Sequence, residues 1–279
     1  RSTIMIRRTK DQVMKELPPK TRTMIPFVVD DAQDKLYRKE EASAIERMRK
    51  LKKERDDWRA LLESLPEADR RAYIAKHAEK AHRAAGLKDM AIAEIEELKK
   101  LAVNAKYSEC VDFTIEKQAT QGKVLVFASH HETIDRLVAS FREKGVKTEF
   151  IDGRVTGIPR QNLIDAFQEG DLQILVCGIR AMAVGANLVA SHTVVFFELD
   201  WTPGIHSQAE DRTHRIGQTK PVTAYYLVLL GSIEEKIAKM IDSKRQVVNA
   251  ILGEGDRSAQ EAGILDAVLD ELLEERKAA

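Results

Sequence analysis

Three side chains suited to binding phosphate follow one another at helical spacing in the C-terminal half of the chain. Gln208, Arg212 and Arg215 stand at positions i, i+4 and i+7, so a helix here would project all three from one face. Arginine presents a planar fork of donors to phosphate oxygens and stabilises the charge that develops on a transferring phosphoryl group. The spacing is equally typical of a solvated helix face, because the interleaved Glu210 and Asp211 can pair with the arginines.

The elements that would position these residues are apolar, β-rich stretches alternating with helical ones. Such alternation predicts an α/β fold with a parallel sheet covered by helices on both faces. The expected strands are 123–128, 146–152, 172–178, 192–199 and 222–230, and the expected helices are 132–144, 159–167, one after Pro203 and one from Ser232.

Polar or small residues stand where four of these strands end. Ligands of parallel sheets bind beyond the carboxyl ends of the strands, so these residues are candidates for a shared binding surface. They are Ser129-His130, Asp152-Gly153-Arg154, the loop 178–187 and Asp200-Trp201.

Two further regions precede the sheet pattern. Residues 1–29 form a basic segment in which Pro18-Pro19 ends a helix, and Pro26 confines a short following strand to a sheet edge. Residues 30–105 are rich in Ala, Glu, Lys, Arg and Leu, which predicts an all-helical insertion of about three helices, broken at 64–66 and at Gly86. Residues 106–252 would then form the α/β domain.

The last residues, 253–279, read as an acidic amphipathic helix that braces the domain or binds a partner. Because the chain begins at Arg1 within what resembles a running motif, we interpret it as a fragment of a longer protein.

Composition excludes several classes of protein. The chain has 279 residues, 43% of them apolar and 32% charged, with a formal net charge of zero, so any nucleic-acid contact must come from local patches. Cys110 and Cys177 lack the spacing of a disulfide framework or a zinc site, and His130-His131 has no further ligand at metal-binding spacing. We therefore expect no metal site, membrane span or signal peptide. We expect an intracellular location, in the cytoplasm or nucleoid, or in the nucleus of a eukaryote.

The residue sequences of several motifs resemble those of a known family. QAEDRTHRIGQ, preceded by DWTP, is similar to motif VI and its lead-in in Swi/Snf-family superfamily II DNA-dependent ATPases, and IRRTKDQVMKELPPK is similar to the segment that enters their second lobe. The resemblance implies a second RecA-like lobe in which Arg212 and Arg215 reach the γ-phosphate of ATP, with Gln208 beside them.

The stretch 178–188 resembles motif V of the same family, in which a loop of small residues lets the backbone approach phosphate. Arg180, Gly185 and Asn187 match and are implied to bind ATP. The family usually has Ser-Thr where this chain has Gly178-Ile179, and paired glycines where it has Met182-Ala183. This looser loop is closer to the annealing-helicase branch.

Two other stretches resemble motif IV (FASHHETIDRL) and the following DG…R…F block. They imply contacts with the backbone of double-stranded DNA by Ser129, His130, Asp152-Gly153 and Arg154, which would position the protein without reading bases. Trp201 stacks on a base or closes a turn onto the core.

The sequence contains no GxxxxGK[ST] loop and no acidic pair after an apolar strand to hold Mg²⁺. It thus predicts the arginine half of an ATP-dependent double-stranded DNA translocase, inactive as an ATPase without an upstream lobe that binds most of the Mg²⁺-ATP. A non-catalytic DNA- or protein-binding regulatory module is an alternative. A small-molecule transferase is a weaker one, because the loop after the first strand, 128–131, lacks glycine.

Overall fold

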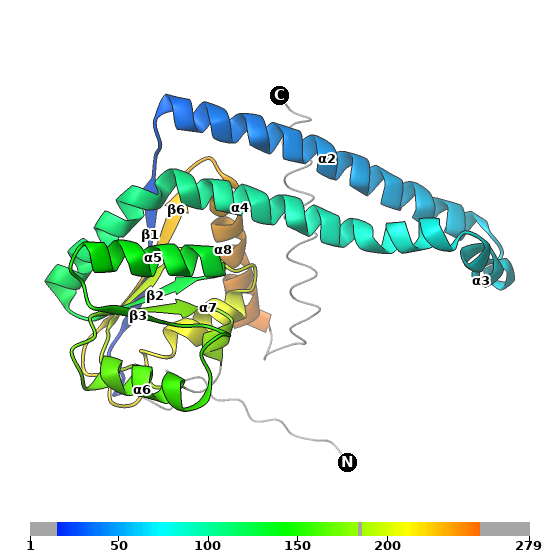
Figure 1. Ribbon diagram of the computed structural model, residues 1–279. Coiled ribbons are helices and arrows are strands. Elements are labelled where there is room, and N and C mark those ends of the chain that lie inside the picture. The colour runs from blue at the N-terminus through cyan, green and yellow to red at the C-terminus, as the bar shows by residue number, and fades with distance from the viewer. Residues whose placement is uncertain (1–15, 184–185, 252–279) are drawn as a thin grey trace, which may run out of the picture. The chain divides into compact units, whose positions relative to one another are not determined.

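The computed structural model describes residues 16–183 and 186–251, which form two compact units (Figure 1). Residues 16–28 and 106–251 make an α/β lobe, and residues 29–105 make a helical unit. Three parts of the sequence-based interpretation lie outside the described residues: the first half of the basic segment, Gly185 in the motif V loop, and the C-terminal stretch 253–279.

The lobe is built on a six-stranded, all-parallel sheet with strand order β1-β6-β5-β2-β4-β3. This confirms the predicted parallel sheet. β1 lies at an edge, where Pro26 costs no ladder hydrogen bond inside the sheet. The strands are β1 (Lys20–Phe27), β2 (Val124–Ala128), β3 (Thr148–Ile151), β4 (Ile174–Gly178), β5 (Thr193–Phe196) and β6 (Val222–Leu229).

Helices cover the sheet as the alternating pattern predicts, with α5 and α6 on opposite sides of it (Figure 1). The central strands β2, β4 and β5 are wholly buried, as expected for a sheet covered on both faces. The helical elements are α5 (His131–Glu143), α6 (Gly157–Gln168), the short η1 (Ala181–Ala183), α7 (Pro203–Glu210) and α8 (Ile233–Ile251), together with the end of α4 (Ala78–Gln121).

One buried ion pair ties two helices of the lobe together. Lys106 of α4 and Glu234 of α8 approach to 2.8 Å, and neither side chain has more than 2% exposure. Lys106 also donates to the Leu227 carbonyl, and Glu234 accepts from the Leu229 N–H at 3.0 Å. Burial raises the pKa of Glu234 even beside this cation.

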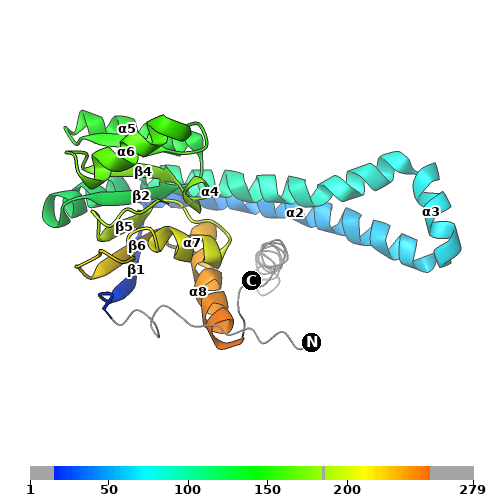
Figure 2. The same ribbon diagram turned by 90° about the horizontal axis from the view of Figure 1, so that it is seen from below.

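The helical unit consists of α2 (Asp31–Ser64), α3 (Glu67–Lys76) and the first part of α4, drawn at the right of Figure 2. The break predicted at residues 64–66 is present, and Asp30 caps α2 by accepting from the Gln33 N–H at 2.8 Å. The break predicted at Gly86 is wrong. Gly86 lies inside α4, where a glycine costs only about 1 kcal/mol, and the chain instead breaks at His77.

Both cysteines are free and buried within the lobe. Burial raises the pKa of the Cys110 thiol to about 12 and that of Cys177 further still, so both stay protonated near neutral pH. Among the described residues, no group of His, Cys, Asp and Glu side chains is arranged to hold a metal ion. No described helix is both long and apolar enough to span a bilayer.

Candidate functional site

The predicted arginine helix is shorter than its pattern indicates. α7 ends at Glu210, so Arg212 and Arg215 lie in the turns that follow, not on the helical face of Gln208. The Thr213 hydroxyl donates to the Glu210 carbonyl at 2.9 Å, a local bond that competes with helix continuation. The residues that follow Glu210, which the spacing predicted to be helical, thus form a compact turn.

Gln218 fixes this turn against the segment that leads from the motif V loop into β5. Its side-chain amide donates to the carbonyls of Val189 (3.1 Å), Ser191 (2.9 Å) and Thr213 (3.2 Å). The preceding Gly217 has φ +99°, a left-handed conformation that favours glycine. The last two residues of the RIGQ stretch therefore shape the turn that carries the arginines.

Positive charge is concentrated at the turn. Arg212 is buried and Arg215 is half-buried. Burial lowers the pKa of Arg212, and the nearby charges of Arg215 and of Arg160 from α6 lower it further, whereas Asp211 raises it. Arg160 reaches the loop after β4 and donates to the Ala181 carbonyl at 3.2 Å. Guanidinium groups gathered in this way favour a polyanionic ligand.

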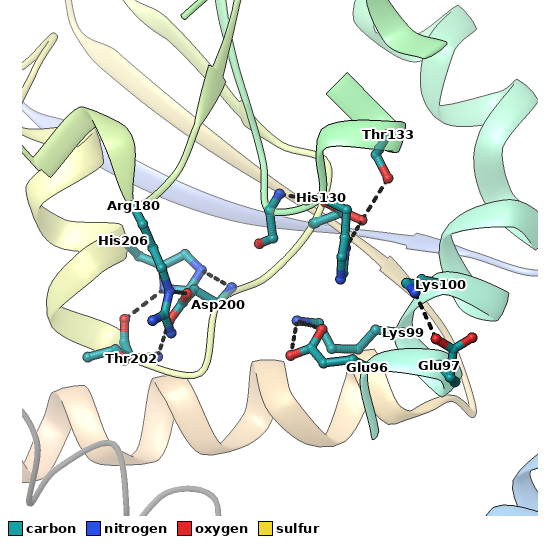
Figure 3. A network of polar contacts seen from close by, with 12 residues as sticks. Glu96, Glu97, Lys99, Lys100, His130, Thr133, Arg180, Asp200, Thr202 and His206 are labelled. Carbon is teal, nitrogen blue, oxygen red and sulfur yellow. Dashed lines mark hydrogen bonds and ion pairs between the residues drawn. The ribbon is translucent and has the colours of Figure 1, made fainter. Parts of the chain in front are cut away.

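A second network holds Arg180 at the end of β4 (Figure 3). Arg180 Nε donates to Asp200 Oδ2 at 2.8 Å, and Asp200 Oδ1 accepts from the Thr202 N–H at 3.0 Å. His206 of α7 accepts from the Asp200 N–H through Nε2 (3.3 Å), while its Nδ1 donates to the Thr202 carbonyl (3.1 Å). This bonding fixes the neutral ring in one tautomer. The DWTP lead-in thus orients Arg180.

The residues that depart from motif V pack inside the lobe. Ile179 and Met182 are buried, with 2% and 0% exposure. A Cβ at Gly178 would stand 3.1 Å from the Asp152 Cβ, so the ends of β4 and β3 approach closely there. Asn187 is exposed. The side chains at 179 and 182 contribute to the core and present no hydroxyl to a ligand.

Glu198 is the centre of a third network, at the end of β2. Figure 3 labels two of its members, His130 and Thr133. Its fully buried carboxylate accepts from the Ser129 N–H, from the His130 N–H and ring Nδ1 (2.9 Å each), and from the Thr133 hydroxyl (2.9 Å). The Ser129 hydroxyl has no hydrogen-bond partner among the described residues. Glu198 therefore sets the conformation of the loop that resembles motif IV.

These bonds predict an acid sensitivity that can be assigned to one residue. Burial alone would raise the pKa of Glu198, but the donors of His130 and Ser129 outweigh it and hold the pKa below its usual 4.5. The stabilisation is thus present above about pH 4.5 and is lost as the pH falls through the native pKa. We expect Glu198→Gln to lower the free energy of unfolding at pH 7 by about 1–3 kcal/mol. Urea titrations from pH 7 to pH 3.5 should show the parent and the variant converging towards low pH. A constant difference would contradict the assignment.

Arg154 is engaged by two carboxylates. Its Nη2 lies 2.6 Å from Asp152 Oδ2 and 2.7 Å from Asp135 Oδ1, and its Nε and Nη1 make further bonds to the same groups. Asp152 is only 1% exposed. Its expected contact with DNA is therefore replaced by an internal role, because a buried anion that holds Arg154 does not face phosphate. Gly153 and Arg154 are exposed beside it.

Two predicted residues, Trp201 and Gln208, remain to be described. Trp201 is 8% exposed, which favours its packing onto the core over base stacking. Gln208 is half-buried on α7. Sequence reasoning missed Asp135, Glu198 and Gln218, each of which has a partner 19 or more residues away along the chain. The available signal for Glu198 was an acidic residue in the otherwise apolar run 194–199.

Two protein-family domains match the chain. The helicase conserved C-terminal domain matches residues 105–217, which include β2 to β5, α7 and the arginine turn. The SNF2-related domain matches residues 2–74.

Curated relatives are longer than the chain. Human "DNA annealing helicase and endonuclease ZRANB3" is 30% identical over 253 residues, covering 90% of this chain and 20% of that protein. Arabidopsis thaliana "ATP-dependent DNA helicase DDM1" is 37% identical over 139 residues, covering 49% of this chain and 18% of that protein. The chain thus spans about a fifth of the length of these relatives.

Solved structures share the fold. The C-terminal part of the Fun30 ATPase domain aligns with a TM-score of 0.62 at 23% identity, over 94% of this chain and 99% of that one. The Sulfolobus solfataricus SWI2/SNF2 ATPase core, solved with double-stranded DNA, aligns with a TM-score of 0.56 at 21% identity, over 92% and 51%. The lobe is RecA-like, of the class found in the C-terminal domains of SWI2/SNF2 ATPases. The chain belongs to the Swi/Snf family of superfamily II helicase-like proteins and corresponds to the C-terminal lobe.

Proposed function

We propose that this chain is the C-terminal half of an ATP-dependent motor that translocates along or remodels double-stranded DNA. The observation that carries the proposal is the turn after α7, in which Arg212 and Arg215 are held in a RecA-like lobe close to Arg160 of α6. Arginines so placed suit the charge that develops on a transferring phosphoryl group.

In this proposal Arg160, Arg212 and Arg215 receive a triphosphate, because each guanidinium group can donate to phosphate oxygens. In the proposed motor an upstream lobe binds most of the Mg²⁺-ATP, which supplies the phosphoanhydride to be hydrolysed. Arg212 and Arg215 complete the site across a cleft, with Gln208, Arg180, Asn187 and the segment around Gly185 contributing further contacts. Closure of the lobes on ATP and opening after hydrolysis would move the motor along DNA.

The proposed DNA-facing surface is the pair of loops after β2 and β3. His130 and Arg154 are partly exposed there, with side-chain exposures of 23% and 40%, and Ser129 and Gly153 lie beside them. Contacts of this kind to phosphates are independent of base sequence, as a translocase requires. The proposal places the protein inside the cell, in the cytoplasm or nucleoid, or in the nucleus of a eukaryote.

Asp135 competes with phosphate for Arg154 in this proposal. We expect Asp135→Asn to tighten the binding of a duplex of mixed sequence several-fold, because the exposed partner of Arg154 loses its charge. Arg154→Ala should weaken binding and reduce the salt slope of log K by about one. Fluorescence anisotropy across a salt titration checks both, with Asp171→Asn, in an exposed pair with Lys147, as the control. Equal affinities for parent and Arg154→Ala at every salt concentration would contradict the assignment.

A second candidate is a regulatory module that kept the RecA-like lobe without motor activity. The specific observation in its favour is the packing of Ile179 and Met182 into the core, where the family usually has a hydroxyl and a glycine. The arginine turn and its supporting bonds weigh against it, because a lobe without catalysis has no need to concentrate guanidinium groups in one turn.

The deciding experiment measures ATP turnover, with and without duplex DNA, by this chain and by a version extended through the upstream lobe. The proposal expects no turnover from the chain alone and DNA-stimulated turnover from the longer protein. Turnover by the chain alone would contradict the half-site assignment. No ATP turnover by either protein would favour the regulatory module.

A further inference from the structure

Glu210, the last residue of α7, has a carboxyl group surrounded by donors from two strands. Its carboxylate is fully buried and accepts from Arg22 through both Nε (2.7 Å) and Nη2 (2.6 Å). Lys20 approaches to 3.0 Å, and the Tyr226 hydroxyl donates at 2.6 Å. The two-bond fork from Arg22 fixes direction as well as distance.

The two cationic donors come from β1, the strand by which the chain enters the sheet. Lys20 and Arg22 are two residues apart, so both side chains project from the same face of the strand. β1 pairs with β6 along its whole length, from Lys20 opposite Val222 to Phe27 opposite Leu229. This pairing fixes the backbone positions of Lys20 and Arg22.

The backbone of Glu210 supports the arginine turn directly. Its carbonyl accepts from the N–H groups of Thr213 and His214, at 3.1 Å each, and from the Thr213 hydroxyl. The ring of His214 donates to the Pro18 carbonyl at 2.8 Å, a second bond between the turn and the segment that leads into β1. One residue therefore joins the first strand to the turn that carries Arg212 and Arg215.

We propose that Glu210, clamped by Lys20 and Arg22, is a positioning residue that keeps Arg212 and Arg215 aligned with the segment by which the chain enters the lobe. This inference rests on the proposed function. In a two-lobed motor the segment before β1 comes from the upstream lobe, so the clamp makes the arginine turn follow the path of the connecting chain. Neither Lys20 nor Arg22 is then a DNA-binding residue.

The test uses the longer protein that carries the upstream lobe. We expect Arg22→Gln to lower kcat for DNA-stimulated ATP hydrolysis roughly 10- to 100-fold, because a displacement of about 1 Å of a catalytic group has effects of this size. KM for ATP and affinity for duplex DNA should stay within about twofold, since the groups that bind the ground state are untouched. Arg22→Lys, which keeps the cation without the fork, should recover part of the rate.

Arg142→Gln is the matched control, because Arg142 forms a 2.6 Å pair with Glu149 in the same lobe outside the arginine turn. An unchanged kcat for Arg22→Gln, or a loss confined to KM or DNA affinity, would overturn the positioning role. If Arg22→Gln yields little folded protein, Lys20→Gln decides, since it leaves the bidentate pair intact. An Arg215→Ala variant assayed in parallel separates the two proposals. Full ATPase activity of Arg215→Ala would overturn the proposed function. Loss of activity in Arg215→Ala, together with full activity of Arg22→Gln, would overturn only the clamp.

Discussion

Arg215→Ala in the longer protein should lower kcat for ATP hydrolysis by about 10³-fold or more while ATP binding changes little. Arg215 is half-buried in the turn after α7 and is close to Arg212. Removing an arginine that stabilises the charge on the transferring phosphoryl group costs about 10³–10⁵ in rate in well-studied phosphoryl-transfer enzymes. The upstream lobe binds most of the nucleotide in this proposal, so the ground state is spared.

Single-turnover hydrolysis and the equilibrium binding of a non-hydrolysable ATP analogue would measure the two effects separately. Arg215→Lys should fall between parent and Ala, because it keeps the charge and loses the planar fork. Arg142→Ala, which removes an arginine of an exposed pair, should retain the parental rate. Retention of most of the rate by Arg215→Ala would exclude its catalytic role. Arg212→Ala is a less direct test, since that side chain is also part of the buried structure.

Lys106→Met should be the most destabilising single change in the lobe that we discuss. It leaves the buried Glu234 carboxylate without the cation 2.8 Å away. Breaking one side of a buried pair costs about 3–5 kcal/mol, because the remaining charge stays desolvated. The pKa of Glu234 is already raised by burial and would rise further, so the deficit should shrink as the pH falls and Glu234 is protonated.

Denaturant unfolding of the chain, followed at pH 7 and pH 5, checks this expectation. The double variant Lys106→Met/Glu234→Leu should recover much of the loss, since replacing both charges by apolar groups removes the desolvation cost. Lys144→Met, which breaks an exposed pair with Asp112, is the control and should cost less than about 1 kcal/mol. If Lys106→Met lowered the free energy of unfolding by less than about 1 kcal/mol, water would have to reach the buried pair.

Local chemistry in the sequence predicted the sheet well. Apolar runs such as 124–128 and 174–178 became buried parallel strands, and Pro26 correctly marked an edge. These features depend on residues next to one another, which is why pattern reasoning reaches them. The same reasoning failed at Gly86, because the residues flanking a glycine decide whether the helix continues through it.

The site was predictable in its location but not in its internal bonding. The candidate loops at 129–130, 152–154 and 200–201 were expected after the carboxyl ends of strands, and the structure places them there. The turn with Arg212 and Arg215 is instead bonded to residues that precede β1 and β5. The prediction that α7 continues through Arg212 was wrong. The Glu210 carbonyl accepts from the Thr213 hydroxyl, and the Glu210 carboxylate is bonded to residues of β1, 188 or more residues away in sequence. Asp152 was likewise expected to face DNA, and only the folded chain reveals that it holds Arg154. Pairings across the sheet have no periodic signature.

The burial of Cys110 and Cys177 also makes the motion of this lobe accessible to spectroscopy. Both thiols are enclosed and protonated near neutral pH, so a maleimide dye should leave the folded parent unlabelled. A single added thiol at an exposed position, for example Lys147→Cys, would then carry the only dye on the lobe. Paired with a second dye on duplex DNA, it would let energy transfer follow each step of the proposed motor without removing a native residue.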